Sequence, residues 1–239
     1  MTQQVTSDML AAGAVTPSIL ANSGSELGLR NRIINGAMMI DQRNAGASVA
    51  ITTNTYVVDR FYNYILGSAT GRYSVQRSTT VPSGFKNSMV LTVSTTDSSP
   101  SALYGYGVSQ NIEGYNIADL GWGAVGAATV TVSFWVRSSI TGTYCLNIAN
   151  DSAQYQYTTT YTINSANTWE YKTITIPGAT SGTWNTDNTG GLNLVFGLGG
   201  GSSRTNGTLN TWGVAGGYTC TAATGTVNLL ATSGATFYI

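Results

Sequence analysis

The sequence contains no histidine and very few charged residues. Asp, Glu, Lys and Arg make up 8% of its 239 residues, where an average soluble domain has about 25%. Ten acidic and ten basic side chains give a formal net charge of zero. The absence of histidine excludes His-based catalysis and His-ligated metal sites. Because the chain has no basic excess, we expect neither a nucleic-acid partner nor a polybasic membrane contact.

Cysteines and long apolar runs are also scarce. Cys145 and Cys220 are too few for a disulfide scaffold, so we expect free, largely buried thiols. A pairing between neighbouring strands stays open. We find no signal-peptide pattern, and no stretch of about 18 apolar residues that would cross a membrane. The chain is still 42% hydrophobic, which excludes a disordered tail.

Apolar and polar residues alternate along several segments with the period of two that a strand requires. Turn residues, such as Pro82-Ser83-Gly84 and Asn206-Gly207, separate these segments, and helical periodicity is nearly absent. This pattern predicts an all-β fold, a jelly-roll β-sandwich over residues 44–239. The clearest expected strands cover residues 89–93, 129–137, 171–176 and 192–198.

The first residues carry a different pattern. Val5-Thr6-x-x-x-Leu10-Ala11 recurs ten positions later as Val15-Thr16-x-x-x-Leu20-Ala21. A unit this short cannot bury its own apolar face, so it favours stacking with sister chains. An amphipathic helix that ends at Pro17 is the alternative. We predict that residues 1–43 form a docking and oligomerisation segment, with contacts through Leu10, Ile19, Leu20, Ile33, Ile34 and Met38.

No pattern in the chain predicts catalysis. Gly121-x-Gly123-x-x-Gly126 matches a dinucleotide-binding fingerprint, but a strand follows it where a helix is required, so it indicates a turn. The acids of the sandwich form no recognisable pair for glycoside hydrolysis. These acids are Glu113, Asp119, Asp151, Glu170 and Asp187. We therefore expect a protein without catalytic residues and without a cofactor, and leave open a structural calcium at Asn150-Asp151 or Asp187-x-Thr189.

The aromatic residues are the most informative group. There are 14 Tyr and 5 Trp but only 5 Phe. This composition favours surfaces that are partly exposed to water, such as protein interfaces and sugar-binding faces. Trp135 alternates with Phe134 and Val136, so its side chain points to the opposite face of the strand. A partner chain, a ligand or a loop must then cover this large apolar side chain. We expect Trp169 to lie in the core. The predicted ligand or interface residues are Trp135, Tyr155, Tyr157, Trp184, Trp212 and Tyr218, all but Trp135 on loops.

Two groups of motifs resemble a known family. The run from Asn31-Arg32-Ile33-Ile34-Asn35-Gly36-Ala37-Met38 to Gln42-Arg43, followed by Tyr56-x-x-Asp59-Arg60-Phe61-Tyr62, resembles tailed-phage virion proteins, including cyanophage tail-fibre and appendage proteins. The later runs Gln110-x-Ile112-Glu113-Gly114, Trp169-Glu170-Tyr171-Lys172 and Phe237-Tyr238-Ile239 are similar to the carbohydrate-binding jelly-roll part of such proteins. The resemblance implies a trimeric virion component without enzymatic activity. Family sequences usually continue beyond the final strand.

The expected function is that of a structural virion protein. Its N-terminus would dock on other phage virion proteins as the particle assembles in the host cytoplasm. Its sandwich would contact a host surface glycan, a sister chain or another part of the particle. Three copies on one particle would raise avidity through effective concentration. Two alternatives stay open. One is a capsid decoration or cement protein, and the other is a glycan-binding module of a bacterial or phage enzyme.

Overall fold

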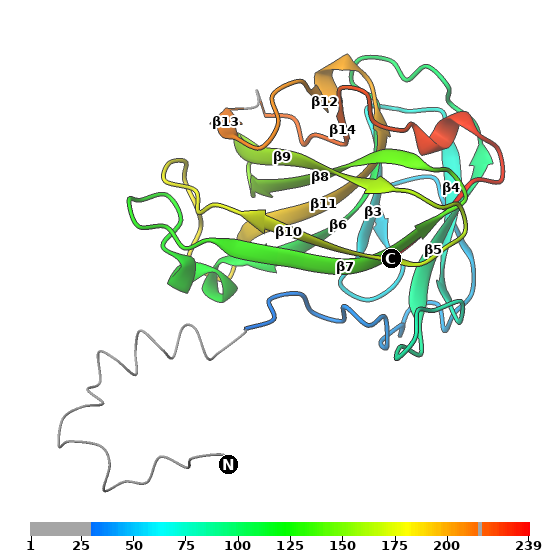
Figure 1. Ribbon diagram of the computed structural model, residues 1–239, viewed down its shortest axis with the longest axis horizontal. Helices are drawn as coiled ribbons and strands as arrows, with labels where there is room; N and C mark the ends of the chain where they lie inside the picture. The colour runs from blue at the N-terminus through cyan, green and yellow to red at the C-terminus, as the bar shows by residue number, and fades with distance from the viewer. Residues whose placement is uncertain (1–29, 215–216) are drawn as a thin grey trace, which may run out of the picture. The chain divides into compact units, whose positions relative to one another are not determined.

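Two antiparallel sheets pack face to face in this protein (Figure 1). The computed structural model describes residues 30–214 and 217–239, of which Ile33–Ile239 belong to one compact unit. One sheet has six strands, in the order β1 (Val49–Ile51), β4 (Arg72–Ser78), β5 (Ser88–Thr95), β15 (Thr236–Tyr238), β7 (Val130–Ser138) and β10 (Glu170–Ile176).

The other sheet has seven strands. Their order is β13 (Trp212–Val214), β9 (Tyr155–Ile163), β8 (Gly142–Asn150), β11 (Gly190–Gly200), β6 (Gly105–Glu113), β3 (Tyr62–Leu66) and β2 (Thr55–Tyr56). A short parallel pair joins β12 (Thr205–Asn206) to β14 (Ala222–Ala223). The helices of the described residues are single 3₁₀ turns, η2 (Gly114–Asn116), η3 (Ala118–Leu120), η4 (Ser202–Arg204) and η5 (Leu229–Ala231).

The predicted all-β jelly-roll β-sandwich is confirmed. Strands β5, β10 and β11 cover three of the strands expected from alternation, and β7 covers the fourth from Val130 onward. Among the described residues no helix has the length and apolar character needed to cross a membrane. The predicted glycine turn is also confirmed, because Gly121, Gly123 and Gly126 all have positive φ between η3 and β7. Cys145 and Cys220 are free and buried, as expected.

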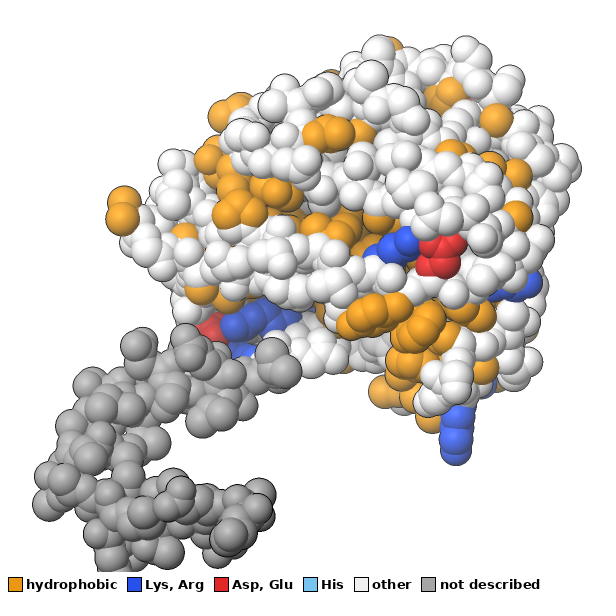
Figure 2. Space-filling model, viewed as in Figure 1, with side chains coloured by type: hydrophobic (Ala, Val, Ile, Leu, Met, Phe, Trp, Pro, Cys, Tyr) orange, Lys and Arg blue, Asp and Glu red, His pale blue; other side chains and the backbone are white. Residues whose placement is uncertain are grey.

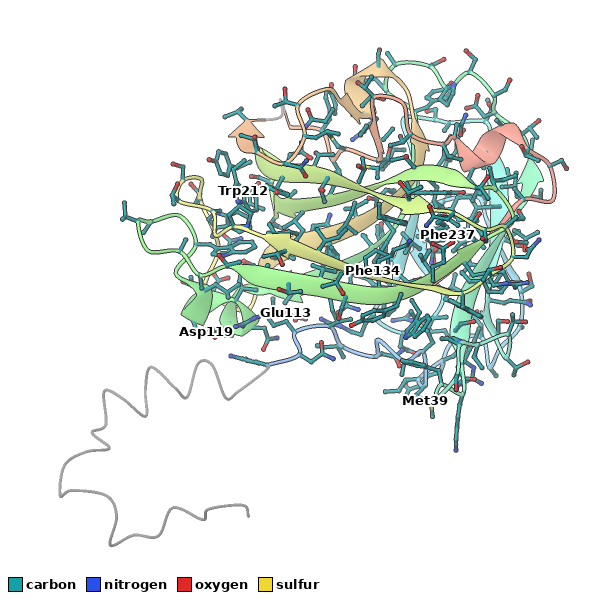
Figure 3. All side chains as sticks on the ribbon, in the orientation of Figure 1. Met39, Glu113, Asp119, Phe134, Trp212 and Phe237 are labelled. Carbon is teal, nitrogen blue, oxygen red and sulfur yellow. The ribbon has the colours of Figure 1, made fainter. Side chains whose placement is uncertain are left out.

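The core lies between the sheets and follows the alternation. Phe134 of β7 packs edge-on against Tyr161 of β9 and Phe196 of β11, with ring centroids 5.0 Å away in both cases. These contacts join the six-stranded sheet to the seven-stranded sheet. Phe237 of β15, fully buried, also crosses between the sheets to contact Tyr144 of β8 (Figure 3). Such aromatic pairs add to the stabilisation that comes from burial alone.

The seven-stranded sheet is covered on its outer face by the chain itself. A Cβ on Gly197 of β11 would collide with the carbonyl oxygen of Thr221, and one on Gly105 of β6 would lie 2.8 Å from the Thr221 hydroxyl. Only glycine permits so close an approach of a second segment. This part of the sheet is therefore closed to large ligands.

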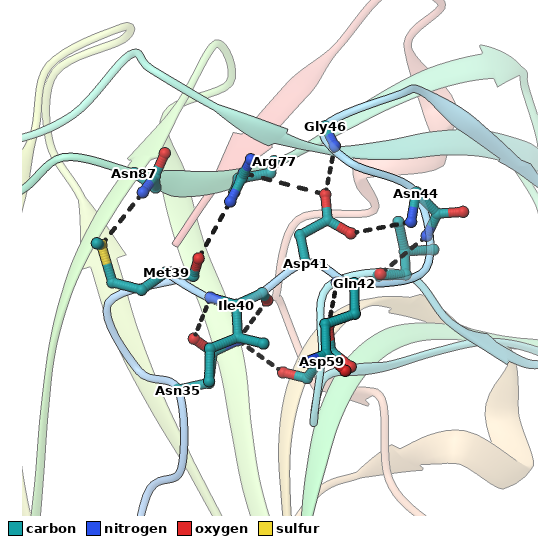
Figure 4. Close-up of polar contacts among 11 residues, drawn as sticks. Asn35, Met39, Ile40, Asp41, Gln42, Asn44, Gly46, Asp59, Arg77 and Asn87 are labelled. Atoms are coloured by element: carbon teal, nitrogen blue, oxygen red, sulfur yellow. Dashed lines mark hydrogen bonds and ion pairs between the residues drawn. The ribbon is translucent and has the colours of Figure 1, made fainter.

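The motif residues that resemble phage proteins hold one part of the sandwich together (Figure 4). The side chain of Asn35, whose φ is 60°, exchanges hydrogen bonds with the backbone of Ile40 and donates to the carbonyl of Asp59. The Asp59 carboxylate accepts from the backbone N–H of Gln42 at 2.7 Å. Asn tolerates this left-handed conformation better than most residues. The motifs thus have a local structural role.

The carboxylate of Asp41 completes this network. It accepts from the backbone N–H of Gly46 at 2.6 Å and from that of Asn44 at 3.3 Å. Arg77 of β4 lies 4.0 Å from the same carboxylate and donates to the carbonyl of Met39. The segment from Asn35 to Gly46 is therefore attached to the edge of the sandwich rather than separate from it.

The structure describes three of the six predicted docking residues, Ile33, Ile34 and Met38. Leu10, Ile19 and Leu20 lie outside the described residues. Met38 is 1% exposed within the core, so in the folded sandwich its side chain contacts this chain itself. Ile33 is partly buried against the core, and Ile34 is 41% exposed. A role of residues 1–43 in docking stays a prediction.

Candidate functional site

Five aromatic rings gather at one end of the sandwich, where Figure 3 shows Trp212 and Figure 2 shows hydrophobic side chains. This end cluster consists of Trp122, Tyr155, Tyr157, Trp184 and Trp212. Trp212 lies at its centre, with ring centroids 5.3 Å from Trp122 and 5.5 Å from Trp184. Tyr155 stacks on Trp212 with an interplanar angle of 4°. The fold thus brings four of the six predicted residues together.

The three indoles of the end cluster are satisfied by this chain's own backbone. The Nε1 atoms of Trp122, Trp184 and Trp212 donate to the carbonyls of Ala128, Ser181 and Pro177, at 2.8, 3.1 and 2.7 Å. Trp122 and Trp184 are each 8% exposed. Trp212 is partly exposed. Because the donors of all three indoles are occupied and two of the rings are buried, the end cluster closes the end of the sandwich and offers little to a ligand.

Several expectations about these residues need correction. Tyr155 and Tyr157 are not on a loop but in β9, and Trp212 lies in β13, paired with Tyr157. Trp184 is on a loop, as predicted. Trp122, between the turn glycines Gly121 and Gly123, was not predicted to belong to this group.

A second group of aromatic residues lies on the outer face of the six-stranded sheet. We call it the outer patch, and it consists of Trp135, Arg137, Trp169, Tyr171 and Tyr238. Tyr171 of β10 pairs in register with Trp135 of β7, and their ring centroids are 5.4 Å apart. Tyr171 is 56% exposed and Trp135 is partly exposed. The outward orientation of Trp135 was predicted from alternation.

Hydroxyl groups surround the Trp135–Tyr171 pair. The side chains of Ser133 and Thr173 lie near the phenol of Tyr171, and their polar groups lower its pKa. Thr131 and Thr175 form the next cross-strand pair along the same face. The outer face therefore has an aromatic centre, with two rings tilted by 51° to each other, among hydroxyl groups. The face of such a ring can stack on a sugar ring.

The remainder of the outer patch is built around Tyr238. Trp169 packs on its ring edge-on at 5.9 Å, and the Arg137 guanidinium lies 4.8 Å from the ring centroid. The expectation that Trp169 belongs to the core is wrong. It stands two residues before Tyr171, so it shares the outer face of β10.

Tyr218 belongs to neither group. It is 41% exposed, and the guanidinium of Arg204 lies 4.8 Å from its ring centroid. The Tyr218 carbonyl accepts a hydrogen bond from the side chain of Gln156. Tyr218 is therefore a single exposed ring on the segment that covers the seven-stranded sheet.

Two of the five acids considered for glycoside hydrolysis form ion pairs. Glu113 contacts Arg60 at 2.6 Å, and Glu170 contacts Lys172 at 2.6 Å. Burial acts to raise the pKa of Glu170, but hydrogen bonds from Lys172, Ser165 and Asn164 outweigh it and lower the pKa to about 2. A general acid requires a raised pKa, so Glu170 is unsuited to that role at neutral pH.

The side chains considered as calcium ligands mainly accept hydrogen bonds within turns. The Asp187 carboxylate accepts from the N–H and hydroxyl of Thr189, and the Asn150 side-chain oxygen accepts from the N–H groups of Gln154 and Tyr155. Within residues 30–214 and 217–239 there is no group of three or more His, Cys, Asp or Glu side chains that would hold a metal ion.

Known proteins resemble this chain in structure but not in sequence. No family model matches the sequence, and no curated protein is significantly similar to it. One similar solved structure is the enzymatically active domain of tailspike protein 4 of bacteriophage CBA120, with 15% identity, a TM-score of 0.36, and coverage of 70% of this chain and 20% of that one.

Two further similar structures are of carbohydrate-binding modules. The first is of a CBM4 module, with 13% identity, a TM-score of 0.39, and coverage of 86% of this chain and 94% of that one. The second is TmCBM61 in complex with β-1,4-galactotriose, with 10% identity, a TM-score of 0.36, and coverage of 87% and 93%. These values are too low to transfer a residue role or a ligand to this chain.

Proposed function

We propose that this protein is a glycan-binding module of a tailed-phage virion, in a tail fibre or another appendage, and that it acts by binding without catalysis. The observation that carries this proposal is the exposed Trp135–Tyr171 pair among serine and threonine hydroxyls. An aromatic face attracts the C–H groups of a sugar ring, and neighbouring hydroxyls bond to its oxygens. The end cluster, in contrast, supports the fold.

The low charge of the surface agrees with this proposal. Figure 2 shows few Lys, Arg, Asp or Glu side chains on the face drawn, and most of that surface is uncharged. A neutral surface does not attract nucleic acids or membranes through salt-dependent contacts. Most of the contacts that this surface offers to a ligand are therefore stacking contacts and hydrogen bonds, and few are ion pairs.

The virion part of the proposal is supported by the motifs that resemble phage proteins. Residues 1–43 would dock the chain on other virion proteins and join three copies, and trimers would raise the avidity for a repeated surface glycan. Light scattering on the full chain and on a chain that lacks residues 1–28 tests this part. A trimer that dissociates on truncation supports it, and a full chain that stays monomeric overturns self-assembly.

Glycan binding is tested by affinity electrophoresis and calorimetry with a panel of neutral and acidic polysaccharides. We expect Trp135→Ala and Tyr171→Ala each to weaken binding by about tenfold, which corresponds to about 1.4 kcal/mol. The matched control is Tyr115→Ala, because Tyr115 is 66% exposed and lies in η2, outside the outer patch. This control should bind like the wild type.

The result also separates the alternatives. A protein that binds phage particles lacking this chain but binds no glycan would be a decoration protein, and the glycan proposal would be wrong. Loss of binding in Trp184→Ala or Trp212→Ala variants that remain folded, with Trp135→Ala unaffected, would move the site to the end cluster. Turnover of a bound polysaccharide would contradict the absence of catalysis.

A further inference from the structure

We infer that the outer patch binds an acidic glycan, in which the guanidinium of Arg137 pairs with the carboxylate of a uronic-acid unit beside the Trp135–Tyr171 pair. This inference rests on the proposed glycan binding and specifies the class of glycan.

The charge distribution on the outer face is the first observation. Strand register places Trp135 opposite Tyr171 and Arg137 opposite Tyr238. Every other outward position of these three strands carries a hydroxyl or an aromatic side chain, so Arg137 is the one charged residue among them. The outward residues of β7, β10 and β15 are Thr131, Ser133, Trp135, Arg137, Tyr171, Thr173, Thr175, Thr236 and Tyr238.

The state of the Arg137 guanidinium is the second observation. Its Nε atom donates to the carbonyl of Asn167 at 2.8 Å, and the group lies 4.8 Å from the ring centroid of Tyr238. Within the described part of the chain, its two Nη groups have neither a hydrogen-bond partner nor a carboxylate. Arg60 and Arg77, by comparison, both contact acidic side chains. Arg137 is thus held in place with its two outer amines available.

The chemistry of this arrangement favours a carboxylate. A guanidinium presents parallel N–H donors that match the two oxygens of a carboxylate, and its orientation here is fixed before a ligand arrives. Trp135 and Arg137 are two residues apart on one strand, so their Cα atoms are separated by about 7 Å. An oligosaccharide with one sugar on the aromatic pair therefore brings a neighbouring unit towards the cation.

The test compares oligosaccharides from polygalacturonate and from alginate with the neutral forms made by carboxyl reduction. We expect the wild type to bind at least one acidic form about tenfold more tightly than its reduced counterpart. Arg137→Gln keeps a donor for Asn167 but loses the charge, so the preference should disappear, whereas Arg137→Lys should keep part of it. The matched control Lys86→Gln removes a positive charge from the β4–β5 turn and should change nothing.

The outcomes separate the inference from the proposed function. Equal binding of acidic and reduced forms, or an unchanged preference in Arg137→Gln, overturns the inference and leaves glycan binding in place. Binding of neither form overturns both. Added salt supplies an independent readout, since it should weaken only the binding of the acidic forms. Trp135→Ala should weaken both forms equally.

Discussion

The end cluster and the outer patch are built from the same residue types but have opposite relations to solvent. At the end of the sandwich, Trp122, Trp184 and Trp212 pack on one another, and every indole N–H has a backbone acceptor. On the outer face, Tyr171 is 56% exposed beside Trp135. Aromatic composition alone therefore does not identify a binding site. The positions of donors and ring faces do.

The two sheets differ in the same way. The outer face of the seven-stranded sheet is covered where Thr221 lies against Gly197 and Gly105. The outer face of the six-stranded sheet displays the Trp135–Tyr171 pair. A sandwich with one covered and one open face directs recognition to the open face, and the following predictions test that division.

The largest expected effect is on stability, from Trp122→Ala in the end cluster. Removal of a large buried side chain typically costs about 3–5 kcal/mol of unfolding free energy. Trp122 is 8% exposed and contacts both other indoles, so the cavity cannot easily collapse. Urea unfolding measures the loss. A cost below about 1 kcal/mol would mean that the end cluster is not a structural element.

A smaller effect is expected from Gly182→Ala. Gly182 has a φ of 86°, and an added Cβ would lie 2.8 Å from the ring of Tyr155. Gly126→Ala is the matched control, because Gly126 has a φ of 90° but no atom within 4 Å of an added Cβ. We expect the control to lose about 1 kcal/mol of unfolding free energy through backbone strain. Gly182→Ala should lose about 2 kcal/mol or more, because the contact with Tyr155 adds to that strain. Equal losses would show that loop contact with Tyr155 is unimportant.

Glu170→Gln tests the support of the outer patch. Glu170 accepts from the backbone N–H groups of Asn164 and Ser165, in the turn that carries Asn167, the acceptor for Arg137. The pKa of Glu170 is lowered from 4.5 to about 2, so its stabilisation is present above pH 4.5 and is lost as the pH falls towards 2.

Solvent screening limits this contribution to about 1 kcal/mol. Unfolding of the wild type and of Glu170→Gln should therefore differ by about this amount above pH 4.5 and converge near pH 2. A difference that is independent of pH would show that the carboxylate charge is not responsible.

The smallest expected effect on stability comes from Trp135→Ala. A cross-strand aromatic pair contributes about 0.2–1 kcal/mol, and Trp135 leaves no buried cavity. The same change should nevertheless weaken glycan binding by about tenfold. Trp122→Ala should therefore lose stability, whereas Trp135→Ala should lose glycan binding. A large loss of stability in Trp135→Ala would place it with the structural residues.

Much of the fold follows from local pattern. Alternation in Thr129–Arg137 predicted both a strand and the outward position of Trp135, and turn residues predicted where strands end. These features depend on neighbours in sequence. The resemblance motifs were visible too, but the hydrogen bonds of Asn35 and Asp59 show that they also maintain local structure.

The assignment of site residues required long-range information. The end cluster forms because β13 pairs with β9, which brings Trp212 against Tyr155 and Tyr157, while Trp122 joins from a turn far earlier in the chain. No local pattern encodes this pairing. For the same reason Trp169 was placed in the core, and the burial of Met38 was not predicted.

The most direct test is a spectrum of the five indole N–H groups recorded by NMR during titration with acidic oligosaccharides from polygalacturonate and alginate. Assignment comes from the Trp→Phe variant at each position. We predict that the Trp135 signal shifts on binding, while the signals of Trp122, Trp184 and Trp212 stay in place because their N–H groups are bonded to backbone carbonyls. Shifts confined to the end cluster, with Trp135 unchanged, would contradict the division between the two aromatic groups.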